Sequence, residues 1–374
     1  MAASSSPSKS LFPIPSGSTA KVSIIDTTSR IGRIPVSYLM EPPLEEFETM
    51  PDLPSWSFLV ESSTTGKKAL FDLGVPPDWE NHFAPAVVEA LKPRGWDIYA
   101  EKHTSQVLEE NGVDLKGIGS IVWRQTCIDS PVETCSHWHW DHLGDPSTFP
   151  PSTEVVVGPG FKEAFMPGHP GKPDSPVRES DFKGRTLREV TFTEPNTLQI
   201  GSFRAHDFFG DGSFYLLDTP GHAIGHVCGL ARTTSHPEET FIFMGGDLCH
   251  HGGEIRPSSY MPLPQQIHLH SHPMTRAMHS PCPGALFEAI QTKRGRSPTK
   301  PFFDPAMGLD IPQAIETIEK AQKADGDENV LFIYAHDATA RGVADLFPQT
   351  ANDWKKRGWR EKMFWAFLAD FGVK

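Results

Sequence analysis

The chain lacks any run of about 20 apolar residues, the length that a membrane-spanning helix needs. Residues 1–20 are rich in Ser and Pro and contain no apolar stretch, so we do not expect a secretory signal there. Basic residues are in the minority, with 34 Lys and Arg against 47 Asp and Glu and a formal net charge of −13. Because nucleic-acid binding draws on clustered Lys and Arg, this balance argues against a nucleic-acid partner.

Cysteine is also scarce. The few that occur are odd in number, scattered and without paired zinc spacing: Cys127, Cys135, Cys228, Cys249 and Cys282. Such a set is typical of reduced thiols in a cytosolic protein, so we expect a cytoplasmic location and no membrane partner.

The 374 residues suit one large domain. We expect a disordered tail over 1–20 and one domain over 21–374, in which the Pro-, His- and Ser-rich range 251–308 forms a loop or lid. Local patterns predict strands at 21–26, 56–61, 68–73, 118–123, 154–157, 188–193, 203–207, 213–217, 241–244 and 330–334, and helices at 85–91, from 310 onward and at 354–371. This order indicates stacked sheets covered by helices.

The densest histidine cluster follows the apolar run 118–123. It contains the pattern H-x-H-x-D-H, formed by His137, His139, Asp141 and His142. The first two histidines lie two residues apart on an extended segment, so they point to one side and can share a metal ion. The aspartate and the last histidine can serve a second ion, because zinc accepts imidazole and carboxylate ligands. The alternative is an exposed His-rich loop.

Three further polar groups follow strands later in the chain. His222 follows a Pro-Gly turn, Asp247 follows two glycines, and His336 follows the run 330–334. Each of them alone is more typical of a structural or surface residue than of a ligand. Together with the first motif, they complete two sets of metal ligands.

In this order the motifs resemble the metallo-β-lactamase superfamily, from about Val22 to Ala344, and most closely its quorum-quenching lactonases and related fungal lactone and lactam hydrolases. The segment that ends Phe71-Asp72-Leu73-Gly74 resembles the first conserved aspartate of that family. The resemblance implies an α/β fold, a four-layer αββα sandwich with two zinc ions at one edge. It also implies a small-molecule substrate.

The resemblance further implies the roles of single residues. One zinc ion would be held by His137, His139 and His222, and the other by Asp141, His142 and His336, with Asp247 bridging them. Metal-bound hydroxide would then open a small cyclic ester or amide, a lactone or a lactam. Asp141 would orient the hydroxide and carry a proton to the leaving group. Asp72 and His226 would fix the orientation of the ligands.

Two features depart from this pattern. In the lactonase branch, a tyrosine three positions after the bridging aspartate helps to hold the substrate carbonyl, whereas this chain has His250. A histidine can donate the same hydrogen bond, or it can lie in a structural loop. The second departure is the segment Arg124 to Cys135, which separates the strand 118–123 from the histidine motif. It is either a loop beside the site or retained intron sequence, and we favour the second because its removal joins strand and motif directly.

Other histidines and other functions stay open as alternatives. His268, His270 and His272 form H-x-H-x-H without an accompanying carboxylate, which favours a loop over the active site rather than a metal site. Phe302 and Phe303 are candidates for the lining of the pocket or for the core. An acyl-carrier thioesterase of the same fold, an iron-dependent redox enzyme and a non-catalytic relative are the competing functions.

Overall fold

Two six-stranded sheets form the centre of the molecule in the computed structural model, which describes residues 10–123, 139–193, 197–275 and 281–372. The first sheet has the order β1 (Ala20–Asp26), β4 (Trp56–Ser62), β5 (Lys68–Phe71), β7 (Ile118–Trp123), β8 (Glu154–Val157) and β9 (Leu187–Glu189). The second has the order β10 (Leu198–Ile200), β11 (Phe203–Asp207), β12 (Phe214–Asp218), β13 (Val227–Thr234), β14 (Thr240–Gly246) and β18 (Val330–Tyr334). Both are mixed: β5, β7, β8 and β9 run parallel to one another, and so do β14 and β18.

Alternation along the strands explains why the sheets form separate layers. Successive side chains of a strand point to opposite faces. In β14, Ile242 and Met244 enter the core between the two sheets, while Phe241 and Phe243 enter a second core on the outer face. In β5, Phe71 faces the core between the sheets and Leu70 faces outward. Each sheet therefore has apolar side chains on both faces, and both faces need a cover.

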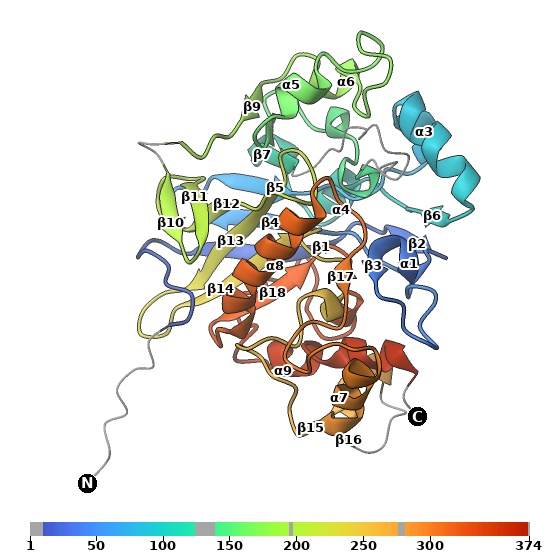
Figure 1. Cartoon of the computed structure of the whole chain (residues 1–374). Helices are drawn as coiled ribbons and strands as arrows, with labels where there is room; N and C mark the ends of the chain where they lie inside the picture. The colour runs from blue at the N-terminus through green and yellow to red at the C-terminus, as the bar shows by residue number, and fades with distance from the viewer. Residues whose placement is uncertain (1–9, 124–138, 194–196, 276–280, 373–374) are drawn as a thin grey trace.

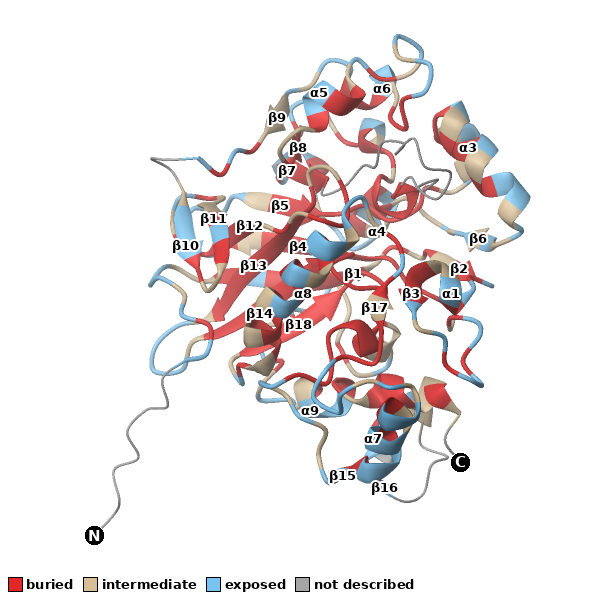
Figure 2. Cartoon of the chain, in the orientation of Figure 1, coloured by how far each residue is buried: buried red, intermediate tan, exposed pale blue. Residues whose placement is uncertain are grey.

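Helices supply the outer layers on both sides (Figure 1). The outer face of the first sheet packs on α3 (Pro85–Leu91) and α4 (Thr104–Glu110), and that of the second sheet packs on α8 (Ile311–Gly326). Figure 2 shows buried strands in the middle and exposed outer sides on the helices. The predicted four-layer αββα sandwich is therefore confirmed.

Smaller elements surround these layers. The remaining helices are α1 (Val36–Leu39), α2 (Trp79–His82), α5 (Phe161–Phe165), α6 (Glu179–Phe182), α7 (Gly284–Lys293) and α9 (Trp359–Met363). Three two-stranded pairs join β2 (Arg30–Gly32) to β6 (Asp97–Tyr99), β3 (Met40–Glu41) to β17 (Asp304–Pro305), and β15 (Gln266–Ile267) to β16 (Cys282–Pro283). None of the described helices has the length and hydrophobicity needed to cross a lipid bilayer. Cys249 and Cys282 are free thiols, and the Cys228 thiol donates to the carbonyl oxygen of Gly245 at 3.1 Å. The other two cysteines lie outside the described residues.

Local signals in the sequence predict several elements well. The helix after Asp310 begins as expected, because the Asp310 carboxylate accepts a hydrogen bond from the Gln313 N–H at 3.0 Å. Gly66 has a φ of 68° in the turn between β4 and β5, which form an antiparallel pair.

Other expectations about the chain need correction. The predicted helix 354–371 is divided into α9 and a 3₁₀ helix over Ala366–Phe371, and Gly358 precedes α9 with a φ of 63°. The range 251–308 is not all loop, because it contains α7. Within the expected tail, Phe12 is 1% exposed and packs on the second sheet. Phe302 and Phe303 are both fully buried core residues.

Candidate metal centre

Segments that follow four strands of the sandwich bring polar residues to one place. Asp141 and His142 lie in the 3₁₀ helix η3 (Trp140–His142), the next described element after β7. Asp247 follows β14, and His336 follows β18. His222 follows β12 after a sharp turn. At Gly221 in that turn φ is 120°, and an added Cβ would lie 2.3 Å from the backbone nitrogen of Ala314 in α8. Only glycine fits there, which explains the Pro-Gly pair before the histidine.

The Asp247 carboxylate is the centre of the cluster. Its Oδ2 lies 3.0 Å from His139 Nδ1, 3.0 Å from His142 Nε2 and 3.7 Å from His222 Nε2. Its Oδ1 lies 3.3 Å from His336 Nε2. One carboxylate therefore faces four imidazoles that come from distant parts of the chain. This is the place that a carboxylate shared between two ions requires.

Six of the seven predicted metal ligands lie in this cluster. They form three overlapping groups whose ligand atoms lie within 4.8 Å of one another, namely His139 with His222 and Asp247, His139 with Asp141 and His142, and His142 with Asp247 and His336. All six residues are buried. The seventh predicted ligand, His137, and the whole segment Arg124 to Cys135 lie outside the described residues.

Neighbouring groups fix the orientation of two of the imidazoles. His336 Nδ1 donates to the carbonyl oxygen of Pro54 at 2.8 Å, which directs Nε2 toward Asp247. His142 Nδ1 lies 3.2 Å from Asp72 Oδ2, which directs its Nε2 into the cluster as well. Asp72 has a φ of 68°, a conformation that is uncommon outside glycine. Its position agrees with the supporting role that the sequence suggested.

Burial and charge set the protonation of the cluster. Burial lowers the pKa of the His139 and His222 imidazoles, although Asp247 opposes this change. Burial would raise the pKa of Asp141, but the His142 and His336 imidazoles outweigh it and hold this pKa well below its usual range. His139 and His222 are therefore in the neutral form that binds a metal ion. Burial would lower the pKa of His336, but Asp247 and Asp141 raise it to about 10, so His336 must give up a proton when a metal ion binds.

This donor set fits a pair of divalent ions. His222 Nε2 and His139 Nδ1 face each other at 3.3 Å in a buried place, and both rings have lone pairs to offer. Two ionised carboxylates supply the negative charge that buried cations need. The residues present therefore fit the metal centre that the motifs predicted.

A cavity lies over the cluster, with about 400 Å³ of space that atoms do not fill, part of it open solvent. Its walls are mainly apolar and aromatic, and they consist of Ile31, Ile34, Tyr38, Leu39, Leu53, Trp96, Trp140 and Met307 beside His139, Asp141, Asp247, His250 and His336. Most of the wall thus comes from residues 31–53 and from Trp96, and Met307 is its member from the predicted lid. Sequence reasoning missed this wall, because the segment has no motif.

His250 is the polar residue of the wall that the metal motifs do not include. Its ring centroid lies 5.0 Å from that of His222 and 5.9 Å from that of His336. Neither ring nitrogen has a hydrogen-bond partner in the part of the chain that the structure describes. The backbone N–H of His250 donates to Glu254 Oε2 at 2.6 Å, which holds the residue in place.

His268 and His272 of the later H-x-H-x-H motif do not join the cluster. The ring of His272 forms a hydrogen bond through Nε2 with the carbonyl oxygen of Thr339 at 2.8 Å. Among the described residues, no group of three potential ligands includes His268 or His272. A different group, His82 with His103 and Asp145, was not predicted and is described further below.

Comparison with known proteins places the chain in a family. It is 44% identical over 364 residues to the γ-lactamase FDB1 of Fusarium pseudograminearum, which covers 95% of this chain and 83% of the relative. It is 40% identical over 361 residues to the metallo-hydrolase mfmC of Annulohypoxylon moriforme, covering 94% and 88%. No family model matches the chain.

Solved structures agree on the fold. The crystal structure of a quorum-quenching N-acyl homoserine lactone lactonase superposes with a TM-score of 0.52 at 14% identity, covering 90% of this chain and all of that one. With the buried His and Asp cluster at the strand ends and relatives that are hydrolases, the chain belongs to the metallo-β-lactamase superfamily, among its metallo-hydrolases.

Proposed function

We propose that the protein is a dinuclear zinc hydrolase that opens a small cyclic amide or ester, a lactam or a lactone. The observation that carries this proposal is the position of Asp247 between four buried imidazoles. In this assignment His137, His139 and His222 hold one ion, and Asp141, His142 and His336 hold the other. Asp247 serves both.

When bound, the two ions lower the pKa of water toward about 7 and polarise the substrate carbonyl. The chain's own residues then position the reactants. Asp141 lines the cavity, and its ionised carboxylate can accept a hydrogen bond from the attacking water. The same group can pass the proton on to the nitrogen or oxygen that leaves when the ring opens.

His250 contributes a hydrogen-bond donor at the cavity wall. Neither of its ring nitrogens has a hydrogen-bond partner within the described residues, and Nδ1 lies 3.7 Å from Glu254 Oε2, so Nε2 can donate to the substrate carbonyl oxygen. The apolar walls formed by Ile31, Leu53 and Trp96 favour an apolar or aromatic substituent on the ring and exclude water from it.

Names of relatives support the amide or ester as substrate. One relative is called a γ-lactamase, and the superposed structure is that of a lactone lactonase. Both ring openings need the same activated water and the same stabilised oxyanion.

The test combines metal content with a substrate panel. We expect the centre around Asp247 to hold about two zinc ions and the protein to open lactams or lactones, and we expect His222→Ala to lose zinc from this centre together with the activity. Asp218→Asn is the matched control, because Asp218 ends β12 but pairs with Arg204 outside the cluster.

Acid release from carrier thioesters alone would favour the thioesterase, and iron with oxygen consumption would favour the redox enzyme. Failure to bind two ions would favour a non-catalytic relative. Sequencing of the spliced transcript would decide whether the segment Arg124 to Cys135 belongs to the protein.

A further inference from the structure

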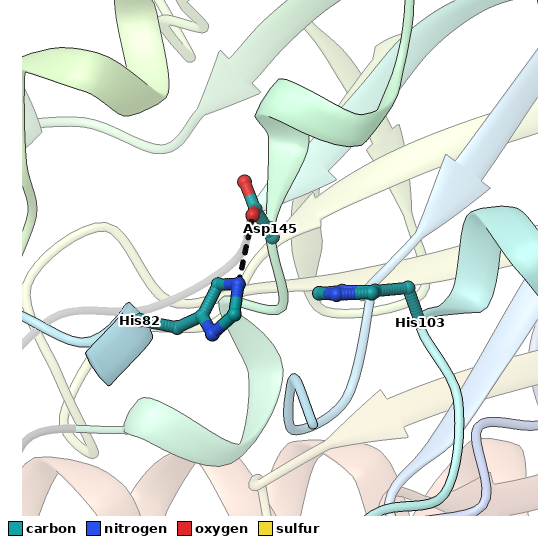
Figure 3. A group of neighbouring side chains, drawn as sticks. All are labelled: His82, His103 and Asp145. Carbon is teal, nitrogen blue, oxygen red and sulfur yellow. Dashed lines mark ion pairs between the residues drawn. The ribbon is translucent and has the colours of Figure 1, made fainter. Parts of the chain in front are cut away.

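A second group of potential ligands lies apart from the metal centre. His82 is the last residue of α2, His103 precedes α4, and Asp145 precedes the short 3₁₀ helix η4 (Pro146–Thr148). The ligand atoms of the three residues lie within 4.8 Å of one another. Figure 3 shows the His103 ring directed edge-on toward His82, with the Asp145 carboxylate beside both. Three loops that are distant in the sequence thus meet at one point.

The tautomer of His82 leaves a lone pair aimed at a carboxylate. His82 Nδ1 forms a hydrogen bond with the carbonyl oxygen of Asp78 at 3.1 Å, so this nitrogen must carry the hydrogen. In a neutral ring the lone pair is then on Nε2, which lies 3.5 Å from Asp145 Oδ2. Two electron-rich atoms that face each other at this distance need a positive charge between them or on the ring.

The Asp145 carboxylate is set up for this contact. Asp145 is buried, and its Oδ1 accepts hydrogen bonds from the N–H and the hydroxyl of Ser147 at 2.9 and 2.6 Å. The other oxygen of Asp145, Oδ2, therefore faces the two histidines. Arg185 is near enough for an electrostatic interaction with the Asp145 carboxylate. Its guanidinium, however, donates to the carbonyl oxygens of Phe149 and Thr153, both at 3.0 Å. In the described ranges, the basic side chain that approaches the Asp145 carboxylate is His82, at 3.5 Å.

His103 adds a third donor. Its ring centroid lies 5.2 Å from that of His82 at an interplanar angle of 65°, so the two rings meet edge to face. Its Nδ1 is buried and has no hydrogen-bond partner among the described residues. Burial also lowers the pKa of His103, so the ring is neutral near pH 7 and keeps a lone pair for a cation.

We propose that His82, His103 and Asp145 bind a divalent transition-metal ion of the zinc class, with water in the remaining positions. Two imidazoles and one carboxylate form a ligand set that zinc uses. Ligand atoms around a tetrahedral zinc ion with bonds of about 2.0–2.1 Å lie about 3.3 Å apart. The 3.5 Å between His82 Nε2 and Asp145 Oδ2 is close to that separation.

The ion would tie together the loops beneath the first metal centre. The Leu73 N–H donates to the carbonyl oxygen of His142 at 3.1 Å, and the Gly144 N–H donates to that of Gly74 at 2.8 Å. The Thr104 hydroxyl donates to the carbonyl oxygen of Leu73 at 2.7 Å. Residues 73–74 are therefore hydrogen-bonded both to the segment that carries His142 and to the start of α4. An ion on the second group supports this arrangement and stabilises the fold.

Zinc counting tests the proposal on the full chain. Metal-free protein is titrated with Zn²⁺, desalted and analysed for bound zinc, and its thermal unfolding is followed with and without Zn²⁺. We expect wild type to hold about one ion more than His82→Gln, and the variant to show a smaller zinc-induced rise in Tm. His236→Gln, at an exposed histidine outside both groups, is the matched control and should equal wild type.

Asp145→Asn provides a second variant that preserves the fold. The asparagine keeps the oxygen that accepts from Ser147 and replaces only the ligand atom that faces His82. It should also lose about one ion. Equal zinc counts in wild type, His82→Gln and Asp145→Asn would overturn the proposal, and so would an equal loss in His236→Gln. Because the comparison is a difference between variants, its outcome is independent of how many ions the first centre holds.

Discussion

The two histidine clusters of this protein use the same residue types in different surroundings. In the centre around Asp247, four imidazoles and two carboxylates are buried together. In the group around Asp145, one carboxylate is buried and the two histidines are half-exposed. The first has overlapping ligand groups and a mainly apolar cavity, whereas the second has one carboxylate and lies where the end of α2 and two loops meet. From this comparison we infer that a ligand set becomes a reactive site only when a cavity and a shared carboxylate accompany it.

The largest expected effect comes from the shared carboxylate. Asp247→Asn keeps the shape of the side chain but removes the charge that faces four imidazoles. We expect kcat/KM for ring opening to fall about 10³-fold, equivalent to about 4 kcal/mol, together with bound zinc. Steady-state kinetics and zinc analysis measure both. Asp145→Asn should lower kcat/KM less than about threefold, and equal losses in the two variants would remove the distinction between the clusters.

The pH dependence of stability should also separate the clusters. In the metal-free chain, burial would lower the pKa of His336, but Asp247 and Asp141 outweigh burial and raise it to about 10. A base with a raised pKa stabilises the fold fully below its unfolded value of about 6.5, and this contribution is lost as the pH rises through about 10. The Tm of chelator-treated protein should therefore fall between about pH 7 and about pH 10.

Bound ions change this pH dependence, since a ligand must give up its proton. Zinc-loaded protein should show a flatter Tm over the same pH range and should release protons when it binds zinc near pH 7. Calorimetric titration in buffers with different ionisation enthalpies measures the proton release. Zinc binding without proton release would show that His336 is already neutral in the metal-free chain.

The residues of the candidate metal centre could be predicted from the sequence, and their surroundings could not. His222, Asp247 and His336 each follow a strand, and the edge of a sheet brings strand ends together. By contrast, the wall residues Ile31 and Trp96 come from irregular segments without a motif. The second cluster was missed for the same reason, because its three members come from three separate loops.

The closing region shows a similar limit. The apolar pattern of 354–371 predicted one helix, but the structure divides it after Met363. Phe364 joins the core between the sheets, whereas Phe367 joins the core of the first sheet's outer face. One straight helix would not place these side chains in two cores that lie on different sides of the first sheet. Tertiary packing therefore overrides the local preference for a helix.

A smaller effect is expected at His250, which lines the cavity without belonging to either ligand set. His250→Phe keeps the ring and removes both nitrogens, so the substrate carbonyl loses a donor. We expect kcat/KM to fall about tenfold, equivalent to about 1.4 kcal/mol, without loss of zinc. His250→Tyr should recover much of the activity, because its hydroxyl restores a donor. Full activity in the phenylalanine variant would assign this histidine to the structural loop.

The smallest expected effect concerns a buried acid beside the second cluster. Burial raises the pKa of Asp181 to about 6, and the hydrogen bond from the Arg178 N–H at 2.7 Å offsets this only in part. An acid with a raised pKa stabilises the fold fully below about pH 4, and this contribution is lost as the pH rises through about 6. At about pH 7 the ionised Asp181 therefore destabilises the fold, unlike Asp141, whose charge the imidazoles compensate.

Asp181→Asn should remove this penalty while keeping an oxygen for the Arg178 N–H. We expect the free energy of unfolding to rise by about 1 kcal/mol near pH 7 and to be unchanged near pH 4. Urea denaturation at both pH values measures it, with Asp174→Asn at an exposed aspartate as the control. Asp145 is close enough to raise the pKa of Asp181, so a cation bound to Asp145 would lower that pKa again. The gain from Asp181→Asn should then shrink when zinc is added, and a gain that zinc leaves unchanged would argue against an ion beside this carboxylate.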